Sequence, residues 1–355
     1  MRIAGLPTKW DAICERRTWH RAHTGTRGSG FGVRDSSPGS RVPSPGLLVT
    51  KPPALRPGDR VAIVSPASPF DRVEFEHGLS EIRRLGYEPV YDDSVFESSM
   101  FTSGSADVRS AAFKRAWSDP TVAALIAARG GYGSVQLLPM FESWRPQETP
   151  KLFIGYSDNT SLLSWLTCQC GVTALYGPMI EGRFARGAEG YDESSLLRLM
   201  QGNGAGLELQ PDGLSVLKTG QADGPLFGGT LTQLVGSLGT PYAFDPPEGC
   251  VLFIEDVNER PYRIDRMMTQ LRLSGVLSRA RGLVFGEMRG CDEPAGTPTA
   301  RDAIQAFTGD FAGPVVFGFP AGHTSGPCWT LPLGVRVHVT TAPRASLRVE
   351  ESPVA

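Results

Sequence analysis

Short apolar strands alternate with helical stretches between residues 60 and 157, and this alternation restricts the chain to few folds. The strand-like segments are RVAIVSPAS, EPVYDD, TVAALIAARGGYG and KLFIGYS, and the helical ones are FEHGLSEIRRLGY, DVRSAAFKRAWSD and SVQLLPMFESW. Such alternation predicts a mainly parallel sheet with helices on both faces, whose ligands bind beyond the carboxyl ends of the strands. Ser65, Gly130 and Ser157 all fall at those ends.

The second half of the chain carries shorter strands and fewer helices. Its strand-like segments are GCVLFIEDV, RGLVFGEM, GPVVFGF and GVRVHVTT, with helical stretches near residues 229–238 and 263–278. We therefore expect an α/β fold with an N-terminal, mostly parallel doubly wound sheet and a smaller C-terminal α+β domain. The predicted segments are an N-terminal α/β domain (residues 49–182), a linker (183–222), a C-terminal α+β domain (223–349) and a tail (350–355).

The first 48 residues differ in composition from the rest. They are rich in Arg, Ser, Gly and Pro and lack apolar periodicity, so they cannot bury enough surface to offset the entropy of ordering. We predict that residues 1–48 are a disordered extension, either a transit peptide or the result of a gene start placed too far upstream. Because the segment lacks the apolar stretch of a secretory signal, we expect a cytoplasmic protein.

Charge and hydropathy argue against two classes of partner. The net charge of −2 gives no global reason to expect nucleic acid or an anionic membrane surface. Residues 1–50 carry a charge of +5 and the remainder −7, so the body of the chain is mildly acidic. No apolar run reaches the roughly 18 residues that a membrane-spanning helix needs. We expect no nucleic acid and no membrane as partner.

Ser157 ends an apolar strand where a helix is predicted to begin. Leu152, Phe153 and Ile154 form the strand, and residues 160–166 have apolar side chains at helical spacing. A serine in such a turn projects from the carboxyl edge of the sheet, beside the free N–H groups and the positive dipole end of the helix. Those groups stabilise an oxyanion, so Ser157 is a candidate nucleophile. The alternative is a structural N-cap, because serine is a favoured cap.

A serine nucleophile needs a base, and His323 is the best candidate among the five histidines. It follows the strand VVFGF in the polar loop AGHTSG, which offers no apolar face to bury it. His20 and His23 fall in the extension, whereas His77 lies on a predicted amphipathic helix and His338 alternates with valines on a strand. A loop histidine with a purely structural role is the alternative.

The third candidate is a carboxylate that would orient the histidine. Glu255 closes the strand VLFIED at its carboxyl end, while the next residue, Asp256, points to the opposite face. The structural alternative for Glu255 is an ion pair with Arg260, Arg263 or Arg266.

The sequence indicates no cofactor. The glycine-rich segment ARGGYG is suited to donate backbone N–H groups to an oxyanion, but it lacks the three-glycine spacing of a dinucleotide site. The six cysteines lack the spacing of metal ligands, and we interpret them as free thiols in a reducing cytosol. A serine triad with a backbone oxyanion hole needs neither a metal nor an organic cofactor, so none is expected.

Several long collinear motifs extend this interpretation. The chain resembles the LD-carboxypeptidases, serine peptidases that include murein tetrapeptide carboxypeptidases and relatives that give immunity to peptidyl-nucleotide antibiotics. The resemblance covers nearly all of residues 50–345. Its motifs here are LRPGDRVAIVSPAS, ARGGYGS, IGYSDNTSLL, LYGPM, GGTLTQLVGSLGTPY, LFIEDVNERPYRIDRMMTQL and GHTSGPCWTLPLG.

The resemblance implies roles for particular residues. The triad of the family falls on Ser157, Glu255 and His323, and the implied oxyanion donors are the backbone N–H groups of Gly131 and Asp158. It also implies a glutamine amidotransferase-like N-terminal sheet, with the serine in the first domain and the acid and base in the second. Closure of the two domains would then assemble the triad. Many relatives form homodimers, so a homodimer is expected.

The implied substrate is a murein tetrapeptide from which D-alanine is released. Arg129, Arg263 or Arg266 would bind its free carboxylate, and the sequence does not choose among them. Thr230 departs from the family, which often has asparagine there, so a substrate contact from this position is in doubt. The body of the chain is short, which favours murein recycling over antibiotic immunity.

Three other functions stay open at this point. One is self-immunity through hydrolysis of peptidyl- or aminoacyl-nucleotide antibiotics, with the same triad. Another is an α/β-hydrolase esterase, although Asn159 stands where that fold usually has glycine. The third is a protein that binds peptides or nucleotides without chemistry.

Overall fold

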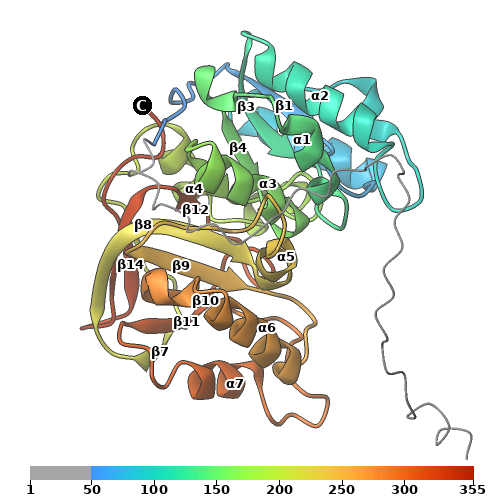
Figure 1. Cartoon of the computed structure of the whole chain (residues 1–355). Helices are drawn as coiled ribbons and strands as arrows, with labels where there is room; N and C mark the ends of the chain where they lie inside the picture. Colours follow the sequence, from blue (N-terminus) through green and yellow to red (C-terminus); the bar gives the residue numbers. More distant parts are fainter. Residues whose placement is uncertain (1–48) are drawn as a thin grey trace, which may run out of the picture. The chain divides into compact units, whose positions relative to one another are not determined.

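A computed structural model describes residues 49–355, so the extension predicted for residues 1–48 lies outside the described part of the chain. The strands of the first sheet are β1 (Arg60–Val64), β2 (Glu88–Val90), β3 (Val122–Ala127), β4 (Leu152–Gly155), β5 (Ala174–Tyr176) and β12 (Leu331–Leu333). Their order is β12-β5-β4-β3-β1-β2 (Figure 1). All neighbours are parallel except β12, which runs antiparallel to β5.

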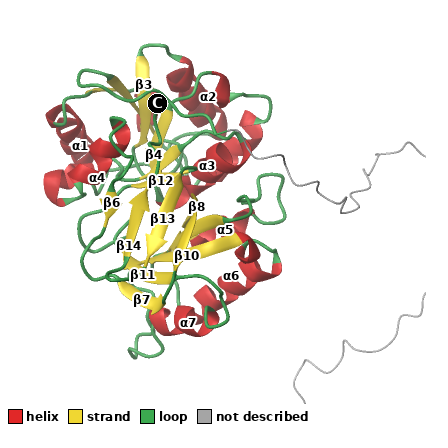
Figure 2. Ribbon diagram, turned by 90° about the vertical axis from the view of Figure 1, so that its left-hand side faces the viewer, coloured by secondary structure: helices red, strands yellow, loops and turns green. Residues whose placement is uncertain are grey.

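Helices cover both faces of this sheet. They are α1 (Arg72–Arg84), α2 (Ala106–Ser118), α3 (Thr160–Ser164) and α4 (Glu193–Met200). Figure 2 shows α1 and α4 on one side of the sheet and α2 and α3 on the other. Polar side chains fix where the helices begin, since Asp71 accepts hydrogen bonds from two N–H groups of α1 and Ser105 caps α2. The predicted doubly wound sheet is therefore confirmed.

Short helical turns complete this half of the chain. They are η1 (Asp93–Phe96), η2 (Ser134–Phe141), η3 (Pro146–Glu148), η4 (Ser157–Asn159), η5 (Trp165–Gln169) and η6 (Phe184–Glu189), with η7 (Leu277–Arg279) further on. The helix expected after Ser157 is built from three short helical elements that follow one another in the chain. It starts as η4, continues as α3 and ends as η5, a π-helical turn.

The second sheet has eight strands, in the order β6-β14-β13-β8-β9-β10-β11-β7. They are β6 (Glu208–Leu209), β7 (Ser215–Lys218), β8 (Gln221–Thr230), β9 (Cys250–Glu255), β10 (Ala280–Gly286), β11 (Val315–Phe319), β13 (Arg336–Thr340) and β14 (Ser346–Val349). The four strands from β8 to β11 are parallel, and the outer ones are antiparallel. Its helices are α5 (Leu231–Ser237), α6 (Pro261–Leu273) and α7 (Ala300–Phe307).

Two hydrophobic cores hold these layers together. One face of the second sheet packs with α5, α6 and α7 around Phe285 and Met268. The other face contributes Phe253 and Val316 to a larger core that continues through the first sheet. The ring of Phe253 lies 5.3 Å from that of Tyr176 on β5, so the two sheets share buried side chains.

The segment predicted as a linker contains regular structure. Residues 183–222 include η6, α4, β6 and β7, and α4 buries Leu196 and Leu199. Residues 350–355 also pack, since Ala355 exchanges backbone hydrogen bonds with the segment at Pro52 and Ala54. The domain boundaries given above remain a prediction.

Within residues 49–355 the chain passes between the two sheets three times, after β5, after β11 and after β12. After β11 in the second sheet, the chain passes through residues 320–330 and enters the first sheet as β12. His323 lies on the crossing segment between β11 and β12.

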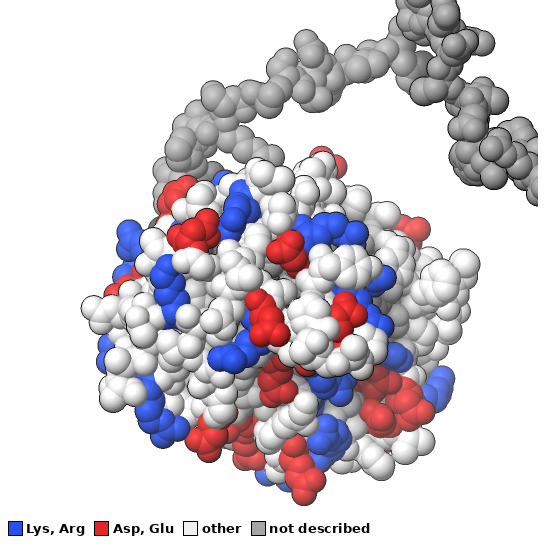
Figure 3. All heavy atoms as spheres, turned by 90° about the horizontal axis from the view of Figure 1, so that it is seen from below, with Lys and Arg blue, Asp and Glu red and all other residues white. Residues whose placement is uncertain are grey.

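On the face shown in Figure 3, basic and acidic side chains are interspersed. Within residues 49–355, no helix is both long and apolar enough to cross a membrane.

Candidate active site

Ser157 occupies a strained turn between β4 and η4. Its φ is +63°, in the left-handed region that non-glycine residues rarely adopt. A conformation of this kind costs on the order of 1–3 kcal/mol and persists only where the surroundings impose it. Gly155 makes the turn compact, because a Cβ there would lie 3.2 Å from the Cβ of Asn159. The strand-to-helix turn expected from the sequence is therefore present, in the geometry typical of serine nucleophiles.

The glycine-rich turn after β3 lies directly against Ser157. A Cβ on Gly130 would be 2.9 Å from Oγ of Ser157 and 3.5 Å from the backbone nitrogen of Asp158. Gly131 has a φ of +96°, and a Cβ there would lie 2.4 Å from Oγ of Ser68. Glycine is thus required twice for this close approach. The glycine turn therefore packs against both Oγ of Ser157 and the backbone nitrogen of Asp158.

Asp158 is buried, and its carboxylate accepts hydrogen bonds from Ser134 and Gln233. The N–H of Ser134 donates to Oδ2 of Asp158 over 2.8 Å, and Oγ of Ser134 donates to the backbone carbonyl of Asp158 over 2.6 Å. Burial raises the pKa of the Asp158 carboxyl, and these hydrogen bonds act against the rise. The backbone N–H of Asp158 lies in the first turn of η4, where a helix has no acceptor of its own.

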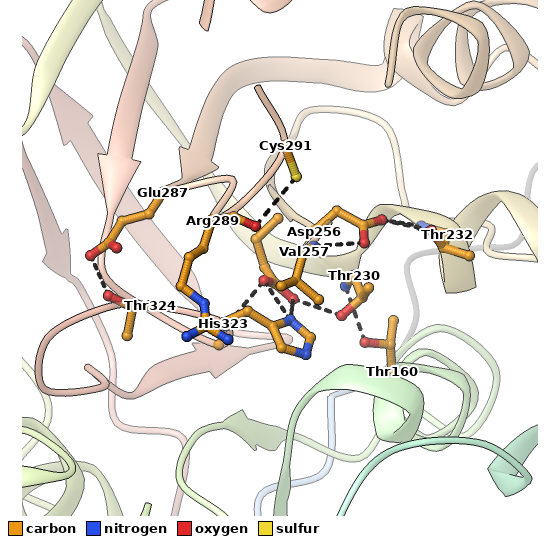
Figure 4. A network of polar contacts seen from close by, with 12 residues as sticks. Thr160, Thr230, Thr232, Asp256, Val257, Glu287, Arg289, Cys291, His323 and Thr324 are labelled. Atoms are coloured by element: carbon orange, nitrogen blue, oxygen red, sulfur yellow. Dashed lines mark hydrogen bonds and ion pairs between the residues drawn. The ribbon is translucent and has the colours of Figure 1, made fainter. Parts of the chain in front are cut away.

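Glu255 and His323 form a hydrogen-bonded pair at the carboxyl end of β9. Nδ1 of His323 lies 2.9 Å from Oε2 and 3.1 Å from Oε1 of Glu255, and the His323 N–H donates to Oε2 over 3.1 Å. Glu255 is 1% exposed. Figure 4 shows the His323 ring with one nitrogen in this contact and the other facing away from it. A carboxylate on Nδ1 leaves Nε2 free to exchange a proton with a nucleophile.

Two hydroxyl groups complete the surroundings of Glu255. Tyr176 donates to Oε1 over 2.5 Å and Thr230 donates to the same oxygen over 2.7 Å. Burial alone would raise the pKa of Glu255, but the charge of His323 and these hydrogen bonds outweigh it, so the pKa is lowered. Gly286 leaves room for this carboxylate, since a Cβ there would lie 2.5 Å from the Cβ of Glu255.

Tyr156 connects the serine turn to the histidine. Its ring packs edge-on against His323, with centroids 5.2 Å apart and planes at 78°. Because Tyr156 directly precedes Ser157, this contact brings the serine turn and the Glu255–His323 pair into one site. The structure therefore gathers the three residues of the predicted triad. Asp256 points away from them, as expected, and accepts hydrogen bonds from the N–H and hydroxyl of Thr232.

The three arginines expected to bind a carboxylate have other partners. Arg129 forms an ion pair with Glu181 at 2.9 Å. Arg263 pairs with Glu259 at 3.4 Å, and the Arg266 guanidinium lies 6.0 Å from the centroid of the exposed Tyr262 ring. Within residues 49–355, no hydrogen bond or ion pair joins these arginines to the triad. The pairing of Arg129 with Glu181 could not be detected from the sequence, because the two residues are far apart in the chain.

Three residues at the site escaped the sequence analysis, and a fourth, Thr230, was considered there only for contact with substrate. Tyr176 and Thr230 support Glu255, and both lie in the motifs LYGPM and GGTL that carried the resemblance. Arg183 and Glu287 hold the loop around His323; Glu287 accepts hydrogen bonds from the hydroxyl of Thr324 and the N–H of Ser325. Neither Arg183 nor Glu287 had a signal in the sequence, because their partners are distant in the chain.

Metal ligands are not grouped in this site. Across the described residues 49–355, no cluster of His, Cys, Asp and Glu is arranged to hold a metal ion. The chemistry available is that of a strained serine, a histidine and a buried carboxylate.

Comparison with known proteins places the chain in a family. The LD-carboxypeptidase N-terminal domain matches residues 61–177, and the LD-carboxypeptidase C-terminal domain matches residues 223–339. The chain belongs to the LD-carboxypeptidase family and is a serine-type carboxypeptidase, as the sequence analysis predicted. The two matched segments carry Ser157 and the Glu255–His323 pair respectively.

Individual relatives agree with this assignment. The chain is 30% identical over 305 residues to the "Probable murein peptide carboxypeptidase" of Bacillus subtilis, covering 84% of this chain and 93% of the relative. A muramoyltetrapeptide carboxypeptidase from Oxalobacter formigenes superposes with a TM-score of 0.73 at 28% identity, covering 83% of this chain and 100% of the other. The microcin C7 self-immunity protein MccF has the same fold, with a TM-score of 0.76 at 22% identity, covering 86% of this chain and 100% of the other.

Proposed function

We propose that this protein is a murein tetrapeptide LD-carboxypeptidase with Ser157 as nucleophile, His323 as general base and Glu255 as the group that orients the base. The observation that carries the proposal is the pairing of His323 Nδ1 with the buried Glu255 at 2.9 Å, beside the strained turn at Ser157. A buried carboxylate in this place fixes the tautomer of the imidazole and stabilises its protonated form.

The reaction proceeds through an acyl-enzyme. Oγ of Ser157 attacks the carbonyl carbon of the amide between an L-centre and the terminal D-amino acid, and its proton passes to Nε2 of His323. The C–N bond then breaks, and His323 returns the proton to the departing amine. Water, deprotonated by His323, attacks the ester and releases the shortened peptide with Ser157 restored. Each turnover consumes one water and breaks one amide.

Backbone donors would stabilise the negative charge on the attacked oxygen. We assign this role to the N–H groups of Gly131 and Asp158. The tight packing of Gly130 on Ser157 Oγ supports the assignment, because it holds the glycine turn and the start of η4 on the same side of the nucleophile. Such preorganised donors are worth about 3 kcal/mol each in related chemistry.

The terminal carboxylate of the substrate needs a cationic partner, and we assign this role to Arg289. Figure 4 shows its side chain extending toward His323 from the loop after β10. Among the described residues its guanidinium has no acidic partner, whereas Arg129 and Arg263 are paired. An Arg289→Met variant should raise KM at least about tenfold while changing kcat little, because a charged hydrogen bond made before and during reaction contributes uniform binding.

The substrate class rests on the relatives. The similarity to carboxypeptidases of murein peptides supports a tetrapeptide substrate. We propose that this tetrapeptide ends in D-alanine and that the enzyme acts as a cytoplasmic homodimer. The test is mass-spectrometric detection of D-alanine released from murein tetrapeptide, with Ser157→Ala as control. Release by the wild-type protein alone supports both substrate and nucleophile.

The similarity to MccF defines the second substrate to assay. MccF has been solved with aspartyl sulfamoyl adenosine, so aminoacyl-nucleotide analogues belong in a parallel assay. Cleavage of these analogues without D-alanine release would overturn the murein proposal and retain the serine chemistry. Failure of a folded protein to react with either substrate or with a fluorophosphonate would remove Ser157 from the mechanism.

A further inference from the structure

Arg183 is a buried cation whose guanidinium donates to several backbone carbonyls and also hydrogen-bonds with the side chain of Tyr156. Its side chain is 6% exposed in the segment just before η6. Nη2 donates to the carbonyl of Gly322 over 2.9 Å and to that of Thr324 over 2.8 Å. Nη1 donates to Gly326 over 3.0 Å, with a longer contact of 3.5 Å to Gly190. Within residues 49–355, no carboxylate forms an ion pair with Arg183.

Two of the residues whose carbonyls accept from Arg183 directly precede and follow His323, the proposed general base, in the chain. These residues are Gly322 and Thr324, so one guanidinium holds a carbonyl before His323 and a carbonyl after it in the chain. Residues 320–330 have no helix or strand of their own and only an isolated bridge at Cys328. The planar fork of a guanidinium can hold several carbonyls at fixed directions, which a lysine ammonium cannot reproduce.

Arg183 also lies near the residue that joins the serine turn to the base. Burial raises the pKa of the Tyr156 hydroxyl to about 12, and the charge of Arg183 acts against this rise. The Tyr156 ring packs on His323 from one side, while Glu255 holds Nδ1 from another. A shift of the 322–326 loop would therefore disturb both contacts of the imidazole.

We propose that Arg183 is a positioning residue that sets the orientation of His323 toward Ser157 by clamping the carbonyls of Gly322, Thr324 and Gly326. The inference rests on the proposed function, in which His323 is the general base. Arg183 would then influence kcat although it touches neither the substrate nor the reacting atoms. A merely structural guanidinium would affect the melting temperature but not the rate of the folded enzyme.

The test compares Arg183→Ala and Arg183→Lys with a matched control, Lys151→Ala. Lys151 is also buried and also donates to backbone carbonyls, those of Asp119 and Val122, but it stands at the opposite end of β4 from Ser157. Loss of alignment by about 1 Å lowers rates by about 100-fold, so we expect kcat of Arg183→Ala to fall by about that factor while KM stays within about twofold. The control should lose thermal stability and keep its kcat.

Chemical rescue separates orientation from packing. Low-millimolar guanidinium ion added to Arg183→Ala should restore a part of kcat that the same concentration of urea or sodium does not. If Arg183→Ala fails to fold, Arg183→Lys provides the test, with kcat about tenfold below wild type because one ammonium holds fewer carbonyls. A folded Arg183→Lys or Arg183→Ala protein with wild-type kcat would overturn the inference.

The rate of fluorophosphonate labelling at Ser157 distinguishes this inference from the proposed substrate. Labelling depends on His323 as base but not on a murein peptide. Wild-type protein that is labelled yet releases no D-alanine would refute the substrate, and slower labelling of Arg183→Ala would still support the clamp. Equal labelling of wild type and Arg183→Ala would refute the clamp while D-alanine release stands.

Discussion

The hydroxyl of Thr230, the last residue of β8, donates a 2.7 Å hydrogen bond to Oε1 of Glu255 at the end of β9. The two residues are in register on neighbouring parallel strands. A side chain that the sequence analysis considered only for contact with substrate is therefore a partner of the acid that orients the base. The backbone N–H of Thr230 in turn donates to Oγ1 of Thr160, which ties this pair to the helix after the nucleophile.

Thr230→Val should lower kcat about tenfold and leave KM nearly unchanged. Valine keeps the shape of threonine but removes a hydrogen bond to a charged group, worth about 1.5–3 kcal/mol. Thr230→Ser retains the hydroxyl and should stay close to wild type. Steady-state kinetics of D-alanine release by both variants is the measurement. Equal rates for the valine and serine variants would show that the hydroxyl does not contribute.

Ser157→Gly should unfold at a higher temperature than Ser157→Ala. Both variants lack the nucleophile, so activity cannot confuse the comparison. Glycine adopts a φ of +63° without steric cost, whereas alanine keeps the strain of the turn. We expect a difference of about 1 kcal/mol in the free energy of unfolding, measured by denaturant titration. A more stable alanine variant would contradict the idea that the turn is strained.

Gly130→Ala should abolish most of the activity in a protein that still folds. The added methyl group would lie 2.8 Å from the Cβ of Ser157, so the glycine turn or the nucleophile must move. The matched control is Gly236→Ala on α5, where no atom lies within 4 Å of the new Cβ. Kinetics and thermal melts of both variants test this, and the control should gain about 0.5–1 kcal/mol because glycine disfavours helices. Wild-type kinetics in Gly130→Ala would be the contrary result.

Asp256 should make the stability of the protein fall as pH rises through about 6. Burial raises the pKa of its carboxyl from 3.8 to about 6. The folded state therefore holds this proton more tightly than the unfolded state, and the stabilisation is present below pH 3.8 and lost as pH rises through about 6. Asp256→Asn cannot titrate. The melting temperature of wild type relative to this variant should thus decline between pH 4 and pH 7, measured at several pH values; a constant difference would contradict the raised pKa.

Strand ends were the informative part of the sequence. Ser157 follows the buried strand β4 and Glu255 ends the buried strand β9, so each could be placed at the carboxyl end of a strand from pattern alone. The two strands belong to different sheets, so the pattern could not show that their ends meet. His323 stood out because its loop offers no apolar surface. In the structure the acid and base are in direct contact, and the ring of Tyr156, which precedes Ser157, packs on the base.

Contacts between distant segments could not be predicted in the same way. Arg183 is 139 residues from Gly322, and nothing in its neighbourhood distinguishes it from other arginines. Arg129 looked suitable for a carboxylate because its partner Glu181 is far away in sequence. The three-residue strand β12 is too short for a periodic signal, yet it pairs with β5 and completes the first sheet.

The position of β12 limits how the gene can be divided or recombined. The sequence match to the C-terminal domain extends over residues 223–339, but β12, which lies within it, belongs spatially to the first sheet. No single cut in the chain separates the two sheets, so neither half can be exchanged with another protein as an intact module. New substrate preferences in this lineage would then arise through changes in loops and side chains rather than by domain shuffling.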